Sequence, residues 1–465
     1  MRPGAPALKE LLARNVRSLS RWAAELTVDA IPGSTLAHAV LVLGDNIAAI
    51  LSAADEPEIR AWHERVLRAR GVQQSTLFMP GAPRVSIADA AVANGLAATW
   101  NELDEGYTRT AIHPGALSQP LILAAAEATG ASVGATLRAV IGAYEIGTRF
   151  ARAWPDTLPR LHPHGAYNAV CAAAGLALLR GFDAAKLELA LTAAATMVSP
   201  GPYSHPIEGA LVRNAWPAGG AWLGLFACDL AEVGIGGLAG GVYDVFERGL
   251  GAASRPDELV DSLDSDWTIC AGYHKLYPAC HHSHAAMEAL QALQARHPEL
   301  VGGEAVEEVL IEGSAMAFNF SNADPSTTLA AKFSIPHAVA GVLVRGAHDA
   351  ALFGAEGLKD SRIASLRQRV RLAQLPEVKP WPRDRPARVT VKLRDGRSLV
   401  EACEAALGSP LRPLGADQVL EKIEKLSRRD APGLAPSIRS LRLAAQDGGL
   451  PDIACREWIS GFFSA

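Results

Sequence analysis

Residues 387–400 read ARVTVKLRDGRSLV, and they decide the fold because they form the clearest β signal in the chain. Val389, Val391 and Leu393 alternate with polar residues, which is the pattern of a strand with one buried face. The Asp395-Gly396 pair that follows is a strong hairpin signal. We therefore expect two antiparallel strands here, in a chain that otherwise consists mainly of helical patterns.

Most of the chain consists of alanine-rich segments with helical periodicity. The segments before residue 265 are 36–53, 86–96, 121–128, 133–153, 166–179, 185–197 and a buried, glycine-rich helix at about 216–233. Later helical segments are 283–296, 335–346, 361–373, 414–426 and 438–444, and 304–312 (EAVEEVLIE) alternates like a strand. The predicted fold is mainly α: residues 1–265 and 411–465 form a large helical domain, and 266–410 form a smaller inserted α/β domain.

The composition favours a globular protein of a reducing compartment. Of the 465 residues, 49% are hydrophobic and 20% are charged, so a sizeable core is available. The net charge of −5 lacks the basic excess that nucleic-acid binding requires. The six cysteines form no CxxC pair, which favours free thiols in the cytosol. The start has no signal-peptide core, and the apolar stretch 215–228 is shorter than the roughly 20 residues of a membrane span. We expect a cytoplasmic protein that contacts neither membrane nor nucleic acid.

Two polar clusters lie in loops of the first half. LDEGY at 103–107 is followed by IHPG at 112–115, and the two carboxylates and one histidine can supply acid–base groups. Taken alone, a helix end with a capping aspartate explains this cluster better. In LHPHGAY at 161–167, His162 precedes a helix whose positive end disfavours protonation, which suits a neutral base. A turn histidine in contact with solvent is an equal alternative.

Two further clusters lie in the second half. YHKLYPACHHSH at 273–284 precedes a helix for which Ser283 is a plausible N-cap, so its free amides and Lys275 make an anion site. Zinc is the alternative, but neither CxxC nor HExxH is present, and we favour the anion site. AKFSIPHAVA at 331–340 places Lys332 and His337 around a proline in a first helical turn, which alone is typical of an ordinary helix start.

In this order the four clusters resemble the MmgE/PrpD family, which includes 2-methylcitrate dehydratase, cis-aconitate decarboxylase and iminodisuccinate epimerase. The family elements are an LD-plus-acidic segment followed by HPS or HPG, a WHPT-like element, K-x-YP-x-C-x-H-x-H and KFS-x-PYAVA. Their counterparts here are 103–115, 161–165, 275–284 and 332–340. The similarity covers roughly residues 15–445.

The resemblance implies a helical domain with an α/β lid, a homodimer, no metal or organic cofactor, and an active site between the domains. The positions that it marks as catalytic are Asp104, His113, His162, Lys275 and Cys280, and those expected to bind substrate are Arg213, His281, Lys332 and His337. Four positions depart from the family pattern: Arg213 replaces a Lys, Trp216 a His, His337 a Tyr and His164 a Thr. Arginine keeps its charge, so Arg213 is expected to clamp a carboxylate and not to act as a base.

Family substrates are small polycarboxylates, and the shared step makes or quenches a carbanion next to a carboxylate. Lys275 and Arg213 could stabilise that charge, with His162 as the base and His113, held by Asp104, as the acid of a dehydratase. An epimerase would need a second base, for which Cys280 or Lys275 could serve. Dehydration is the first choice, and epimerisation or decarboxylation are alternatives. A non-catalytic carboxylate-binding protein and a zinc hydrolase built on Cys280 are readings from other classes.

Overall fold

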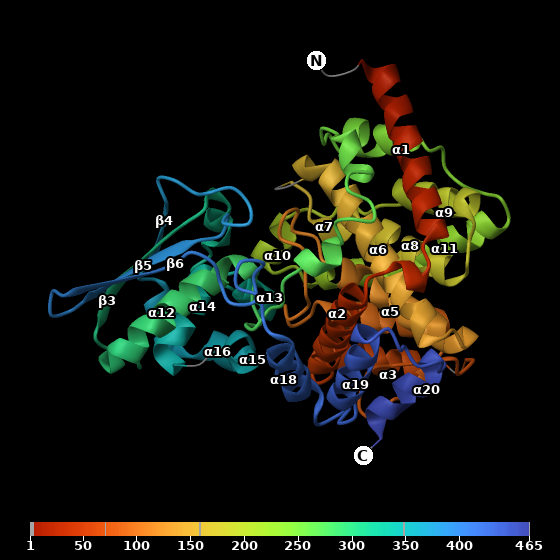
Figure 1. Cartoon of the computed structure of the whole chain (residues 1–465). Helices are drawn as coiled ribbons and strands as arrows, with labels where there is room; N and C mark the ends of the chain where they lie inside the picture. Colours follow the sequence, from red (N-terminus) through yellow and green to blue (C-terminus); the bar gives the residue numbers. More distant parts are fainter. Residues whose placement is uncertain (1–3, 70, 158–159, 347–348, 465) are drawn as a thin grey trace.

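The computed structural model describes residues 4–69, 71–157, 160–346 and 349–464. It contains a large helical domain and a smaller domain with a four-stranded sheet, which projects to one side (Figure 1). The fold is mainly α, as the sequence predicts. The helices of the large domain are α1 (Ala5–Glu25), α2 (Gly33–Ser52), α3 (Pro57–Arg68), α4 (Ile87–Ala98), α5 (Pro114–Thr129), α6 (Val133–Ala153), α7 (Pro163–Ala166), α8 (Asn168–Leu179), α9 (Ala184–Thr196), α10 (Ser204–Glu208), α11 (Trp216–Glu232), α18 (Ala416–Ser427), α19 (Leu434–Gln446) and α20 (Cys455–Ser460).

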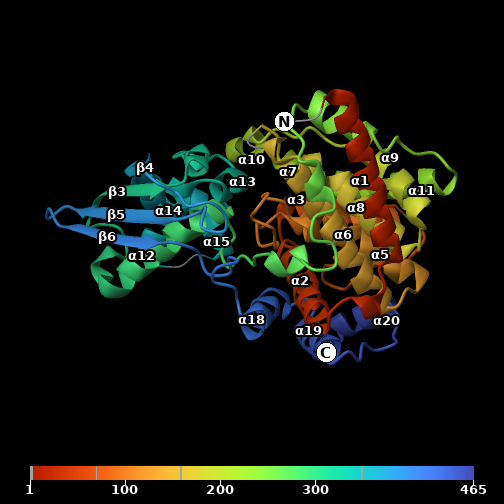
Figure 2. The same ribbon diagram turned by 45° about the horizontal axis from the view of Figure 1, so that its top comes forward.

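Both ends of the chain build this domain. Helices α18 and α19, from the C-terminal part, pack against α2, and Figure 2 shows them beside it from a second direction. The buried apolar residues of the domain form one core that runs from Leu8 to Ile269 and from Val419 to Phe462. Among the described residues, only α2 is long and apolar enough to cross a membrane. Since 89% of its apolar window is buried in the protein, α2 is the core helix of a globular domain.

Helix α11 is buried on one face only, in contrast to the fully buried helix expected at 216–233. Gly220 and Gly224 let it approach α8 closely, because an added Cβ would lie 2.4 Å from Asn168 Cβ and 2.6 Å from Ala172 Cβ. On the opposite face Trp222 and Phe226 are 57% and 49% exposed. The glycine-rich sequence reflects the close packing of that one face.

The lid sheet has the order β4 (Val370–Gln374), β3 (Val306–Gly313), β5 (Ala387–Leu393) and β6 (Ser398–Cys403). Strands β5 and β6 form the predicted antiparallel hairpin, with Gly396 at a φ of 89° in its turn. The helices of the lid are α12 (His284–Arg296), α13 (Thr328–Lys332), α14 (Ile335–Arg345), α15 (Ala350–Phe353), α16 (Ala355–Lys359) and α17 (Ser361–Arg367). Helices α12 and α14 contact the sheet, and the buried side chains between them form a second core.

The helix predicted over 361–373 is wrong in its second half. Helix α17 ends at Arg367, and residues 370–374 form β4, which pairs in parallel with β3 through Val370 and Val309. The pairing strand lies some sixty residues earlier in the chain, so no local pattern could indicate it. Tertiary pairing therefore overrides a helical periodicity that continued into this segment.

Candidate active site

The two domains meet where the loop between α4 and α5 crosses the segment that leads into the lid. Gly106 and Tyr273 form an antiparallel bridge, with N···O distances of 3.2 and 2.8 Å. A Cβ on Gly106 would lie 2.7 Å from the Tyr273 ring, so the crossing needs glycine at this position. The crossing places Asp104, two residues before Gly106, beside Lys275, two residues after Tyr273.

Two buried carboxylates and two buried cations form the centre of this crossing. Glu102 Oε1 lies 2.5 Å from Arg213 Nη1, and Glu102 Oε2 lies 3.0 Å from Lys275 Nζ. Asp104 Oδ1 lies 3.4 Å from the same Nζ. Burial opposes ionisation of Glu102, but the charges of Arg213 and Lys275 outweigh it and lower the pKa of this carboxyl. Burial also opposes protonation of Lys275, yet the two carboxylates raise its pKa above the ordinary value, so Lys275 stays charged.

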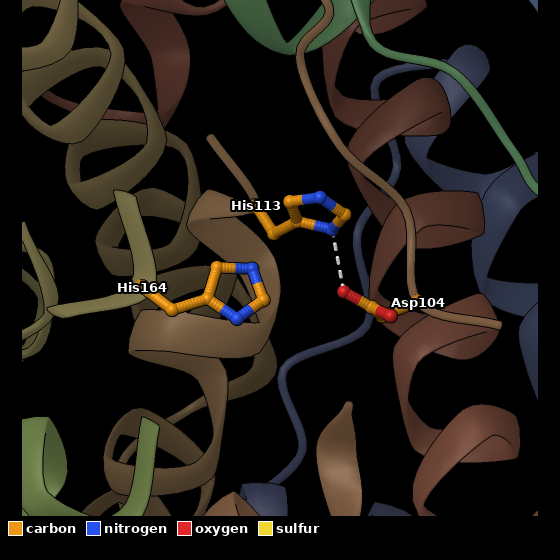
Figure 3. Close-up of side chains that lie close together, drawn as sticks. All are labelled: Asp104, His113 and His164. Atoms are coloured by element: carbon orange, nitrogen blue, oxygen red, sulfur yellow. Dashed lines mark hydrogen bonds and ion pairs between the residues drawn. The ribbon is translucent and has the colours of Figure 1, made fainter. Parts of the chain in front are cut away.

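His113 is held by Asp104 in an orientation typical of a general base. Its Nδ1 lies 2.6 Å from Asp104 Oδ2, which Figure 3 marks with a dashed line. Because the carboxylate accepts a hydrogen bond from Nδ1–H, the neutral ring carries its lone pair on Nε2. Burial lowers the pKa of His113, although Asp104 partly offsets the effect, so the ring is neutral near pH 7. Nε2 lies 3.5 Å from the Tyr273 hydroxyl, and both side chains line the interdomain cavity.

His162 has the opposite tautomer. It is the N-cap of α7, and its Nδ1 accepts a hydrogen bond from the backbone N–H of His164 at 3.1 Å. The proton of the neutral ring is therefore on Nε2, which leaves a donor there. Burial, followed by the positive charge of Arg213, holds the pKa of His162 well below its usual value. Burial is the main cause of the neutral state, because the helix predicted from about 166 is α8, and His162 precedes only the four-residue helix α7.

His164 lies behind these two histidines. Its ring is fully buried, with centroids 4.4 Å from His162 and 4.7 Å from His113. Neither ring nitrogen has a hydrogen-bond partner among the described residues. Asp104, His113 and His164 offer three possible metal-ligand atoms within 4.8 Å of one another (Figure 3). A cation at this point would compete with the Lys275 ammonium for Asp104, so this ion pair disfavours a metal here.

A small cavity lies in front of the cluster. Its volume is about 30 Å³, which holds roughly one water molecule. The residues that line it are Glu102, Ala111, His113, His162, Tyr203, Arg213, Tyr273, Lys275, Cys280, His281, His282, Phe333 and Arg385. An outer cleft of about 520 Å³ shares Ala111, Tyr203, His282 and Arg385 with it. The cleft therefore leads from the surface to the cluster between the two domains.

Cys280 and His281 line the lid side of this cavity. Burial raises the pKa of the Cys280 thiol to about 11, so it is protonated at neutral pH. His281 Nδ1 lies 3.1 Å from Arg385 Nη1. The nearby His284 turns away, because its Nε2 contacts the Ala279 carbonyl at 3.0 Å. Ser283 occupies the N-cap position of α12, but its hydroxyl donates to the Cys280 carbonyl and does not cap the helix.

Two of the expected substrate-binding residues do not line the cavity. Lys332 reaches across the domain boundary, and its Nζ donates to the Trp100 carbonyl and to Asn101 Oδ1, at 2.8 and 2.9 Å. It thereby fixes the loop that carries Glu102. His337 lies in the lid core, where its Nε2 is 2.9 Å from the Leu352 carbonyl. Its place in the first turn of α14 is as expected, but the ring faces the neighbouring helix and not the other domain.

Several residues at the site were not among the predicted ones. Glu102 precedes the LDEGY motif by one residue and has a φ of 51°. Tyr273 and Tyr203 line the cavity. Arg385 lies in a loop, WPRDRP, that has no periodic pattern. Two of them had a signal in the sequence: Glu102 lies next to the LDEGY motif, and Tyr273 begins the cluster at 273–284.

Comparison with known proteins decides the relationship. The MmgE/PrpD N-terminal domain matches residues 17–258, and the MmgE/PrpD C-terminal domain matches residues 277–433. The chain belongs to the MmgE/PrpD family. Tyr273 and Lys275 lie in the short segment between the two matched regions, and both regions contribute residues to the inner cavity, such as His113 from the first and Cys280 from the second.

Curated relatives in this family are named for one reaction. The chain is 26% identical over 444 residues to cis-aconitate decarboxylase of Aspergillus terreus, with 88% of each protein covered. It is 24% identical over 443 residues to the cis-aconitate decarboxylase-like protein oryM of Aspergillus oryzae, with 88% of this chain and 89% of the relative covered. These identities relate the whole chain to enzymes and leave its own reaction to be argued from the site.

Proposed function

We propose that this protein is a lyase that acts on a small di- or tricarboxylate by removing a proton next to a carboxylate. One observation carries the proposal: the Asp104–His113 pair presents a neutral ring nitrogen to a cavity that two cations, Lys275 and Arg213, also line. A base beside fixed positive charge is the arrangement that carbanion formation next to a carboxylate requires. A binding protein without catalysis would have no need for the base.

Hydrogen bonding exchanges the roles that the sequence suggests for the two histidines. In our proposal His113 Nε2 takes the proton as the C–H bond breaks, and Asp104 stabilises the imidazolium that forms. His162 Nε2–H donates a hydrogen bond to the substrate oxygen that carries developing charge. When the carbon–carbon double bond forms and the C–O bond breaks, the imidazolium of His113 returns its proton to the departing hydroxyl, which leaves as water.

The protonation states favour elimination over epimerisation. Epimerisation needs a second base on the opposite face of the substrate, and Cys280 and Lys275 were the candidates. The thiol of Cys280 has a pKa of about 11, and the pKa of Lys275 is raised as well, so both are proton donors at pH 7. Of these three residues, only His113 can accept a proton at pH 7, which supports a lyase.

Decarboxylation is the second candidate, and the names of the curated relatives favour it. The same cluster would serve it: Lys275 and Arg213 would stabilise the carbanion left when carbon dioxide departs, and a donor would then protonate the carbon. We further propose that no metal or organic cofactor takes part, which the cationic surroundings of Asp104 support. The six free thiols support a cytoplasmic location.

We also propose that the chain forms a homodimer through the outer face of α11 and the segment after it. Trp222, Phe226, Val233, Ile235 and Leu238 are exposed there, with Leu238 at 77%. Large apolar side chains gathered on one face of a soluble domain are typical of a protein interface.

One assay tests the reaction. The protein is incubated in deuterated water with a panel of di- and tricarboxylates, and NMR follows the carbon-bound protons. Formation of an alkene supports dehydration, release of carbon dioxide supports decarboxylation, and inversion of a stereocentre with deuterium uptake supports epimerisation. Absence of any change across the panel, with binding retained, would instead indicate a carboxylate-binding protein.

A further inference from the structure

The cluster at the domain crossing has no net charge with which to attract a polyanion. Glu102 and Asp104 carry two negative charges, and Arg213 and Lys275 carry two positive charges in direct contact with them. The histidines nearby have lowered pKa values because they are buried, and they add no charge near pH 7. A substrate with three carboxylates therefore needs a further cation at this cavity.

Arg385 is that cation. It lies in the loop that leads into β5 of the lid and lines both the inner cavity and the outer cleft. Its Nη1 contacts the neutral His281 ring at 3.1 Å, and its Nη2 donates to the Thr108 carbonyl at 3.2 Å. Its nearest carboxylate is the partly exposed Asp384, 3.5 Å from Nε, and this Nε is buried without a hydrogen-bond partner among the described residues.

We propose that Arg385 binds the third carboxylate of a tricarboxylate, and that it thereby selects tricarboxylates over dicarboxylates. The inference rests on the proposed function. A planar guanidinium offers two parallel donors that match a carboxylate, and here those donors are held only by neutral acceptors that a carboxylate can replace. Lys275 and Arg213 hold the reacting end at the domain crossing, while Arg385 holds the other end from the lid.

The test uses two saturated ligands that cannot react, propane-1,2,3-tricarboxylate and pentanedioate, which differ by one carboxylate. Calorimetry measures the affinity of each for the parent protein, Arg385→Gln, Arg385→Lys and the control Arg383→Gln. Arg383 is an exposed arginine on the same loop, which does not line the inner cavity. We expect Arg385→Gln to lower the affinity for the tricarboxylate about 10- to 100-fold, which is the range for a charged hydrogen-bonded contact. The dicarboxylate should change less than about threefold in Arg385→Gln, and Arg383→Gln should bind both as the parent does.

The outcomes separate the two proposals. If the parent binds the tricarboxylate, two results for Arg385→Gln refute the role of Arg385 while the proposed function stands. Either the variant binds the tricarboxylate as tightly as the parent does, or it loses affinity for both ligands to the same extent. If the parent binds neither ligand, the substrate class itself is wrong and both proposals fall. An intermediate affinity for Arg385→Lys, which keeps the charge without the fork, would support carboxylate pairing over a role in lid packing.

Discussion

Replacing Asp104 by asparagine tests the assignment of the base without changing the shape of the site. Asp104 is fully buried between His113 Nδ1 at 2.6 Å and Lys275 Nζ at 3.4 Å. The Lys275 ammonium only donates, so the amide oxygen of asparagine must face it. The amide N–H₂ then faces His113, whose Nδ1 is forced to accept. The proton of the ring moves to Nε2, and the lone pair that takes the substrate proton is lost.

The size of the effect follows from what is removed. Loss of a general base typically costs about 10²–10⁴-fold in rate, and we expect proton exchange from substrate into deuterated water to fall by that amount. Substrate binding should change only a few-fold, because Lys275 and Arg213 keep their positions. Removal of one partner from a buried ion pair also destabilises the fold, by roughly 3–5 kcal/mol, so the assay is run well below the unfolding temperature of the variant.

His162→Ala provides the matched comparison. If His113 is the base, this variant retains measurable exchange while elimination slows, because only a hydrogen-bond donor has been lost. If His162 is the base, as the sequence suggested, exchange stops in His162→Ala. Exchange at the parent rate in a folded Asp104→Asn protein would refute the assignment of His113 as the base.

Four further predictions concern binding, metals, pH and assembly. Arg213→Lys should mainly raise KM in steady-state kinetics, since lysine keeps the charge but lacks the two parallel donors of the guanidinium. A large fall in kcat at unchanged KM would contradict this prediction. Prolonged treatment with a chelator should leave the activity unchanged, and recovery by one specific divalent metal after a loss would show that a metal takes part. Burial raises the pKa of Glu105 from 4.5 to about 8, so stability should fall as the pH rises from about 4.5 to 8 and level off above. The loss of unfolding free energy over this range has an upper bound of about 4–5 kcal/mol, at 1.36 kcal/mol per unit of pKa. Thermal unfolding of Glu105→Gln should show a smaller loss of stability with pH than the parent, and an equal loss would contradict the prediction. Trp222→Asp should convert a dimer to a monomer in light scattering while Leu443→Asp, on the distant α19, should not.

The fold could largely be predicted because its helices and its hairpin are encoded locally. The helix expected at 133–153 is α6, and the hairpin expected at 387–400 is β5 and β6. The strand β4 could not be predicted, because its partner β3 is distant in the chain and pairs in parallel. The sequence also did not predict that one face of α11 is exposed, because its alanines and glycines are equally apolar on both faces.

Several residues that the sequence suggested for the site line one cavity, but the sequence did not predict the contacts between them. Asp104, His113, His162 and Lys275 lie in short polar clusters within an apolar sequence, and the domain crossing brings them together. Which ring nitrogen carries a proton depends on partners such as Asp104 Oδ2 and the backbone N–H of His164, and a sequence does not specify these contacts. His337 was misplaced because its cluster starts a helix whose orientation only the lid packing determines.

The division of the site between two domains has a consequence for turnover. The inner cavity, at about 30 Å³, is too small for any polycarboxylate, and the outer cleft leads to it past Arg385 and Tyr203. The lid loop is held to the helical domain by neutral contacts, including Trp381 Nε1 to Thr108 Oγ1 at 2.9 Å and Arg385 to the Thr108 carbonyl. A substrate carboxylate that pairs with Arg385 replaces one of these contacts with a stronger one. We therefore expect the loop to open for entry and to close on the bound substrate, so that water is excluded only when a substrate of the right charge is present.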